Sequence, residues 1–184
     1  MAIPDRDEAR RILAARRLPA AIVAHSEGVA RVAAEAARLA AAAGIPVDIG
    51  LVEVAALLHD IDKVATADGS EPHGVAGARM LEQMGFRELA LPVASHPVTA
   101  LLDEHRHPRG WPSVLVSLAD KHVADVYVTI DERLDDMARR YPDYRAGIDA
   151  ARRPAHALER DLAEATGISE TELVARLRAA WEEQ

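Results

Sequence analysis

The sequence predicts an all-α protein. Apolar residues recur at helical spacing in several segments, and no segment of any length alternates between apolar and polar residues as a half-buried strand does. The 184 residues are 49% hydrophobic but only 3% aromatic, and alanine, leucine and valine dominate. Small aliphatic side chains favour closely packed helices, and this length suits one compact domain. We therefore expect a bundle of helices around a real hydrophobic core.

The first two helices follow from charge, apolar spacing and a terminating glycine. Residues 5–16 form a short charged segment that we expect to be helical. A long helix should follow from Pro19 to about Ala43, because its apolar residues share one face and Gly44 is a usual C-terminal residue. The residues expected on that face are His25, Val29, Val32, Ala36 and Leu39.

The middle of the chain divides at its capping and helix-breaking residues. Asp48 is a good N-cap, a stretch rich in Asp, Gly, Ser and Pro predicts a loop, and Gly85 and Pro97 each end a helix. The expected segments are a helix from Asp48 to about His59, a loop over 61–72, a helix from His73 to Gly85 and a helix over 87–96.

The C-terminal third is also expected to be helical. Residues 103–112 form a polar loop, after which Ser113 should cap one long helix that continues to Arg139. The sequence Ser169-x-x-Glu172 predicts a capping box before the last helix. We expect a domain core over residues 1–141 and a helical C-terminal extension over 142–184 packed on it, with Pro142 and Pro154 interrupting the chain.

Composition restricts the partners and the kind of metal site. The net charge of −8 argues against a nucleic-acid surface, which needs clustered Lys and Arg, although a small anionic substrate can still be held by local charge. The chain has no cysteine, so any metal must be held by His, Asp or Glu. No apolar h-region or membrane-spanning run is visible, so we expect a cytoplasmic protein.

The segment Leu-Leu-His-Asp-Ile-Asp-Lys at residues 57–63 carries the strongest chemical signal. An apolar helix runs directly into His59 and Asp60, and burying both is costly unless something pairs with them. Helical phase also points His25 and Asp120 inward. Two imidazoles and two carboxylates suit a borderline divalent first-row ion, and four protein ligands leave positions for water and substrate.

Each of these residues also has a purely structural interpretation. A lone His25 would more often be a core histidine, and Asp60 could simply end a helix. Asp120 could pair with Lys121 or with a neighbouring Arg, although helical phase places the Lys121 side chain about 100° away. We expect His122 at the surface, together with His156.

The order His25 … His59-Asp60 … Asp120 resembles the HD domain, the superfamily of metal-dependent phosphohydrolases. LLHDIDK is similar to the LLHDIGK common in that family, HGVAGARMLEQMGF to the segment that opens the next helix in HDIG-type members, and SLADK to the stretch carrying the last Asp. The resemblance covers about residues 22–130. It implies an HD-domain helical bundle, here with a helical C-terminal extension.

The resemblance also implies a ligand set. His25, His59, Asp60 and Asp120 would hold a first ion. Some members hold a second ion, with the central Asp bridging and two further histidines added, and His73 and His96 fall in the matching interval. The expected cofactor is therefore one or two divalent ions, Fe, Mn, Co, Ni or Zn, with Mg as a further option.

Catalytic and substrate roles follow in the same way. Lys63 matches a basic residue that lies near the substrate phosphate in the family, while Asp60 or Asp120 would steer or deprotonate the attacking water. Asp62 stands where the family commonly has glycine, and we expect it to face solvent or pair with Lys63. Arginine suits bidentate phosphate contacts. The candidate phosphate or ribose contacts are Arg79, Arg106 and Arg109.

The predicted function is hydrolysis of a phosphate ester or anhydride of a nucleotide or another small phosphorylated metabolite by metal-activated water. Two alternatives remain open. One is a nucleotide-binding regulatory HD module without turnover, and the other is a di-iron oxygenase with the same fold. We expect a small phosphorylated substrate, no membrane and no nucleic acid, and the sequence leaves room for a homodimer.

Overall fold

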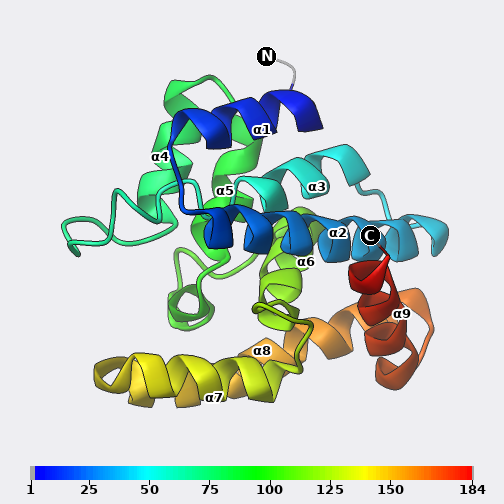
Figure 1. The fold of residues 1–184 in the computed structure, drawn as a ribbon. Coiled ribbons are helices and arrows are strands. Elements are labelled where there is room, and N and C mark those ends of the chain that lie inside the picture. Colours follow the sequence, from blue (N-terminus) through cyan, green and yellow to red (C-terminus); the bar gives the residue numbers. More distant parts are fainter. Residues whose placement is uncertain (1–2, 184) are drawn as a thin grey trace.

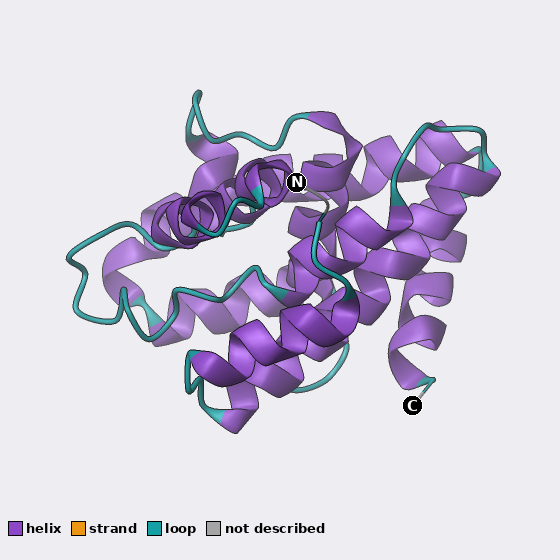
Figure 2. Cartoon of the chain, turned by 90° about the horizontal axis from the view of Figure 1, so that it is seen from above, coloured by secondary structure: helices purple, strands orange, loops and turns teal. Residues whose placement is uncertain are grey.

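The fold is a bundle of helices, described for residues 3–183 by a computed structural model (Figures 1 and 2). Within those residues there are nine α-helices, two short 3-10 helices and no strand, which confirms the all-α prediction. The α-helices are α1 (Arg6–Ala15), α2 (Ala20–Ala42), α3 (Ile49–Leu57), α4 (Val75–Gln83), α5 (Arg87–Ser95), α6 (Gly110–His122), α7 (Ile130–Arg140), α8 (Arg145–Thr166) and α9 (Glu170–Glu182); the 3-10 helices are η1 (Val98–Leu102) and η2 (Pro142–Tyr144).

Helices α2 and α6 lie at the centre of this bundle. Figure 1 shows α6 between two layers, with α2 and α3 above it and α7 and α8 below. Helix α2 contacts α3, α6, α8 and α9, and its buried side chains are mostly alanine and valine. Such small side chains let neighbouring helix axes approach closely. Asp48 caps α3 as predicted, since its Oδ1 accepts a hydrogen bond of 3.0 Å from the Leu51 amide.

The prediction of one long helix from Ser113 to Arg139 is wrong. Helix α6 begins at Gly110 and ends at His122, so that Ser113 is buried inside it. The chain then turns, with the Val128 amide donating to the His122 carbonyl oxygen at 2.9 Å. Thr129 begins α7 with a capping box, in which Thr129 and Glu132 each bond the other's backbone amide. The Thr-x-x-Glu sequence was the available signal for this break.

The segment after residue 141 packs on the same core as the helices before it. Helix α8 contacts η1, α6 and α7, and α9 contacts α2. A Cβ added at Gly28 of α2 would lie 3.2 Å from Trp181 Nε1 of α9, so glycine permits this close approach. Pro154 lies inside α8 and does not interrupt it, contrary to expectation. Ser169 caps α9, but the Glu172 carboxylate bonds Arg176 rather than completing a box.

None of the described helices combines the length and apolar character that crossing a bilayer requires.

Candidate metal centre

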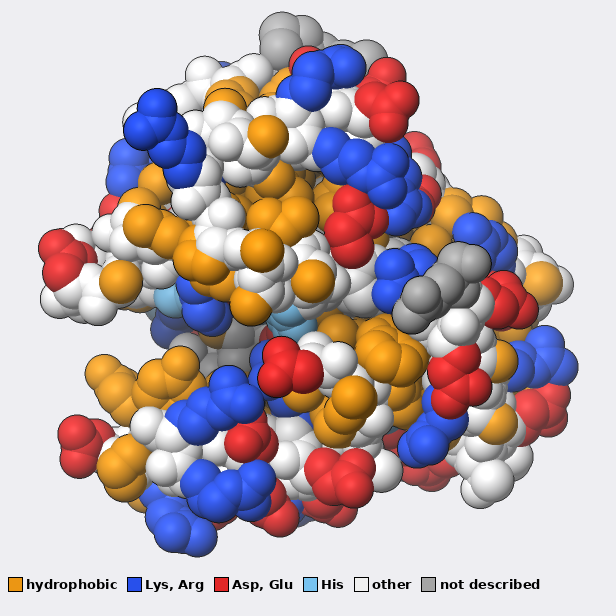
Figure 3. Space-filling model, in the orientation of Figure 1, with side chains coloured by type: hydrophobic (Ala, Val, Ile, Leu, Met, Phe, Trp, Pro, Cys, Tyr) orange, Lys and Arg blue, Asp and Glu red, His pale blue; other side chains and the backbone are white. Residues whose placement is uncertain are grey.

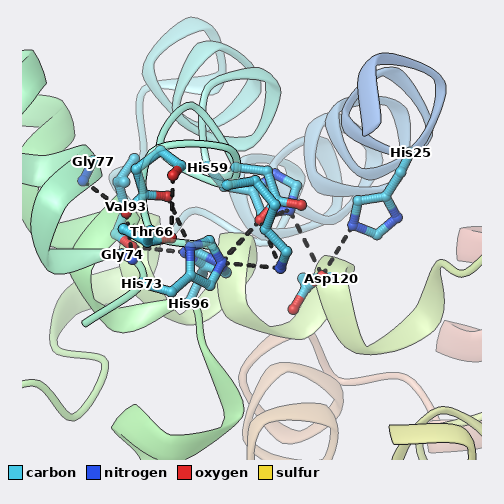
Figure 4. Close-up of polar contacts among 12 residues, drawn as sticks. His25, His59, Thr66, His73, Gly74, Gly77, Val93, His96 and Asp120 are labelled. Carbon is cyan, nitrogen blue, oxygen red and sulfur yellow. Dashed lines mark hydrogen bonds and ion pairs between the residues drawn. The ribbon is translucent and has the colours of Figure 1, made fainter. Parts of the chain in front are cut away.

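The structure brings together all six residues that the sequence predicted as metal ligands (Figure 4). They come from helices far apart in the chain and from the turns beside them. His25 lies on α2, His59 and Asp60 in the turn after α3, His73 in the turn before α4, His96 directly after α5, and Asp120 on α6. This convergence is what a metal site requires, while ligation by these residues remains a prediction.

The facing atoms of the six side chains form a continuous cluster. His25 Nε2 lies 3.2 Å from Asp120 Oδ1. His59 Nε2 lies 3.7 Å from both Asp120 Oδ1 and Asp60 Oδ1. Asp60 Oδ1 is in turn 2.9 Å from His73 Nε2 and 3.7 Å from His96 Nε2. Two groups are compact enough to hold an ion, and they share His59: His25, His59 and Asp120, and His59, Asp60 and His96.

Three of the imidazole rings are oriented by hydrogen bonds at Nδ1. His59 Nδ1 is 2.6 Å from the Ala56 carbonyl oxygen, and His96 Nδ1 is 2.7 Å from the Val93 carbonyl oxygen. Both acceptors lie three residues earlier in the chain, in the preceding helix. His73 Nδ1 is held by a carboxylate instead. Fixing Nδ1 leaves each Nε2 directed into the cluster, which is the usual arrangement of metal-bound histidines.

His59 provides the test of whether a metal fits here. Its side chain is fully buried, and its Nε2 has no hydrogen-bond partner among the described residues. Burial lowers the pKa of His59 to about 3, so the ring is neutral and its Nε2 lone pair is available. A buried polar atom without a partner is costly, and a cation bound by these donors would remove that cost. The donor set therefore fits a divalent metal.

The two carboxylates of the cluster are ionised. Burial opposes the charge on Asp60, but the surrounding histidines, of which His73 is nearest at 2.9 Å, hold its pKa well below the usual value. Burial likewise opposes the charge on Asp120, and Lys121 and His25 outweigh it. Charged oxygen donors are therefore present at neutral pH, as a divalent ion prefers.

The expectation that helical phase separates Asp120 from Lys121 is wrong. Lys121 Nζ lies 3.1 Å from Asp120 Oδ2, because the long side chain turns back within the fully buried core. The same ammonium donates to the His96 carbonyl oxygen at 2.6 Å and to the Ser117 carbonyl oxygen at 3.2 Å. Lys121 thus balances the Asp120 charge and ties the end of α5 to α6.

Asp62 does not face solvent and does not pair with Lys63, so both expectations for it are wrong. Its side chain is fully buried and accepts hydrogen bonds from His73 Nδ1 at 2.7 Å and from the Gly74 and Gly77 amides at 2.8 Å each. The same carboxylate therefore both caps the start of α4 and orients the His73 ring. Burial disfavours protonated His73, yet hydrogen bonds to Asp60 and Asp62 raise its pKa to about 9.

A cavity of about 200 Å³ opens beside this cluster. Its walls include His25, Asp60 and Lys63, and also Arg133 of α7. Figure 3 shows a hollow between the upper and lower layers, with histidine and basic side chains along it. Lys63 Nζ is 3.4 Å from Asp60 Oδ1, and its side chain is 41% exposed, so it can reach a bound anion. A larger cavity, of about 570 Å³ between α6 and α8, shares no lining residue with this one.

The three arginines predicted as phosphate contacts do not line this cavity. Arg79 bonds Glu71, Arg106 bonds Asp103, and Arg109 donates to the Glu104 carbonyl oxygen. Each is held by a partner close in sequence and outside the cavity. Arg133 and Arg140 of α7 line the cavity instead, and the mistaken single helix is the reason that sequence reasoning missed them.

His122 was also misplaced by that mistake. It is buried where α6 ends, with Nδ1 3.0 Å from the Val128 carbonyl oxygen and Nε2 3.0 Å from Glu159 Oε2 of α8. Its ring stacks on Tyr127. His156 lies at the surface, as expected, with its side chain 40% exposed, and is 3.2 Å from Asp131.

Comparison with known proteins identifies the family. A family model described as the HD domain matches residues 22–135. An uncharacterized protein of Methanocaldococcus jannaschii is 33% identical over 128 residues, which cover 65% of this chain and 75% of that protein. No solved structure matches. HD domains bind divalent metals, and the His and Asp cluster is able to hold one. The chain therefore belongs to the HD domain family, within the superfamily of metal-dependent phosphohydrolases.

Proposed function

We propose that this protein hydrolyses a phosphate ester or anhydride of a nucleotide or another small phosphorylated metabolite. One observation carries the proposal: a cluster suited to a metal opens into a cavity whose walls carry Lys63 and Arg133, and its buried His59 Nε2 has no partner within residues 3–183. Enzymes of phosphoryl transfer combine a bound metal with cationic side chains, and this cavity has metal-binding side chains and cationic side chains in its walls.

The proposed ligands are those that converge in the structure. His25, His59, Asp60 and Asp120 would hold one ion, and His73 and His96 would complete a second site around Asp60. Their nitrogen and oxygen donors suit Fe, Mn, Co, Ni or Zn. A bound divalent ion would lower the pKa of water towards neutrality and polarise a phosphoryl oxygen.

The remaining steps fall to the side chains of this protein. Hydrolysis forms a bond from the water oxygen to phosphorus and breaks the bond to the leaving oxygen, which keeps the electron pair and takes a proton. Asp60 and Asp120 are ionised and can orient the water or accept its proton. Lys63 lies beside Asp60 and is placed to neutralise charge on the phosphoryl oxygens.

The test begins with elemental analysis of the purified protein. It is followed by a panel of phosphate esters, nucleotides and nucleoside polyphosphates assayed with the metal that is found. His59→Ala and Asp60→Ala should each abolish both metal binding and turnover, whereas His156→Ala, at a surface histidine outside the cavity, should leave both unchanged. Undiminished turnover in a metal-free preparation would contradict the proposal. Nucleotides that raise the melting temperature without forming product would support a regulatory module instead.

A further inference from the structure

Arg133 is a largely buried cation next to the His and Asp cluster. It occupies the first turns of α7, and the Thr129 capping box fixes the start of that helix. Its Nη2 lies 3.6 Å from Asp120 Oδ1, and its side chain is 16% exposed. It lines the same cavity as His25, Asp60 and Lys63. The guanidinium is therefore held at the inner part of the cavity, beside a proposed metal ligand.

The hydrogen-bonding capacity of Arg133 is unused in the described structure. Its Nε is buried and has no hydrogen-bond partner among the described residues. The 3.6 Å separation from Asp120 is beyond the range of a hydrogen bond. The two Asp120 oxygens already have hydrogen-bond partners, since Oδ1 contacts His25 and Oδ2 contacts Lys121. Arg140, on the same wall, is 2.7 Å from Asp136. A buried guanidinium nitrogen such as this Nε is costly without an acceptor, and an oxyanion in the cavity would supply one.

The cavity itself limits what can bind there. About 200 Å³ is less than the roughly 300–1,000 Å³ of sites that enclose a whole ligand. The cationic and metal-binding groups are buried or half-buried, whereas Asp125, Arg140 and Tyr141 on the same cavity are exposed and form its rim. Part of the wall is apolar, from Ala21, Ile22 and Met137. A phosphoryl group would fit inside, with the carbon-containing part of the molecule at the rim.

We propose that Arg133 and Lys63 together bind the oxygens of a terminal phosphoryl group, so that the protein acts on phosphomonoesters or terminal phosphates in preference to phosphodiesters. This rests on the proposed function. A terminal phosphoryl group has more non-bridging oxygens and more negative charge than a diester, and it suits two cations that line the same cavity. A diester has organic substituents on two of its phosphorus-bound oxygens, and this small cavity has no room to hold either of them beside the phosphoryl group.

The first test compares 4-nitrophenyl phosphate with bis(4-nitrophenyl) phosphate as substrates of the metal-loaded protein. We expect a kcat/KM at least about tenfold higher for the monoester, and a loss of roughly 10²–10³-fold on Arg133→Gln. Arg133→Lys keeps the positive charge but lacks the paired N–H donors of the guanidinium, so its activity should lie between those of Arg133→Gln and the wild type. Arg139→Gln is the matched control on α7, since Arg139 is 69% exposed and does not line the cavity. Equal or better turnover of the diester would overturn the proposal.

The second test does not depend on turnover. Binding of inorganic phosphate to the metal-loaded protein is measured by calorimetry, with metal content checked for each variant. We expect Arg133→Gln to weaken phosphate binding at least about tenfold with metal content unchanged. If Arg133 serves only to neutralise Asp120, the substitution will alter metal affinity and leave phosphate affinity intact, which overturns the proposal. If the wild type binds phosphate through Arg133 but hydrolyses no substrate, the proposed function fails while the anion site stands.

Discussion

The two ends of the His and Asp cluster are built differently. At the α2–α6 end, the carboxylate of Asp120 faces His25 directly and has the cations Lys121 and Arg133 beside it. At the α4–α5 end, Asp60 is contacted by histidines and by the partly exposed Lys63, and the extra carboxylate, Asp62, lies behind His73.

This difference shows how one fold distributes charge around a candidate metal centre. At the first end, the buried Lys121 and the largely buried Arg133 balance a carboxylate that is itself a proposed ligand. At the second end, a buried carboxylate orients His73 and also caps a helix, so it acts on the centre through another residue. Disrupting the first end should therefore cost stability, whereas disrupting the second should mainly cost metal affinity.

The largest effect is expected for Asp120→Ala in protein kept metal-free with EDTA. The substitution leaves the buried Lys121 ammonium without its counter-charge, and breaking a buried pair in this way costs roughly 3–5 kcal/mol. Urea unfolding measures the change. The double variant Asp120→Ala with Lys121→Met should regain a large part of the loss, because the unpaired charge is gone. A double variant no more stable than Asp120→Ala would show that the pair is not what stabilises this end.

A smaller effect is expected for Asp62→Asn. Losing the charge weakens the hold on His73 and on the α4 amides, so affinity for a second metal equivalent should fall about 10–100-fold. Metal titration followed by calorimetry measures both equivalents, and the one held by His25 and Asp120 should be retained. Asp68→Asn, at an exposed position of the same loop, is the control. Equal weakening of both equivalents would remove the distinction between the two ends.

The pH dependence of stability should also differ, again with EDTA present. His73 has its pKa raised from 6.5 to about 9, so its stabilisation is complete below pH 6.5 and is lost as pH rises through 9. Burial lowers the pKa of His59 to about 3, so between pH 6.5 and 3 the unfolded chain is protonated at this residue while the folded protein is not. The free energy of unfolding therefore falls from pH 6.5 towards 3. Denaturation of His73→Gln between pH 6.5 and 9 should show a flatter slope than the wild type. An unchanged slope would argue against the His73 contacts.

The smallest effect is expected for Arg79→Gln. The Arg79 side chain is half exposed and bonds Glu71, outside the cavity. Exposed ion pairs contribute little, so neither KM nor the melting temperature should change measurably. A raised KM would restore Arg79 as a substrate contact and would contradict the position assigned to the substrate here.

Local sequence signals were enough for much of the fold. Apolar spacing predicted the helical class, Asp48 predicted a cap that the structure contains, and the glycine and proline positions marked several helix ends. They failed at residues 123–129. There, apolar residues at helical spacing continue past His122 to Val123 and Tyr127, although the Thr129 capping box starts a new helix. That failure hid the α7 wall of the cavity, and with it Arg133.

By itself, the sequence determined the family and the residue types that converge, because the spacing His25, His59-Asp60 and Asp120 is a local and ordered pattern. Tertiary structure alone decided what surrounds them. Whether Asp62 faces water or His73, whether Lys121 turns back to Asp120, and which arginine enters the cavity all depend on contacts between residues on separate elements. Burial of a charge is costly unless a partner is brought to it, and only the packed helices determine which partner that is.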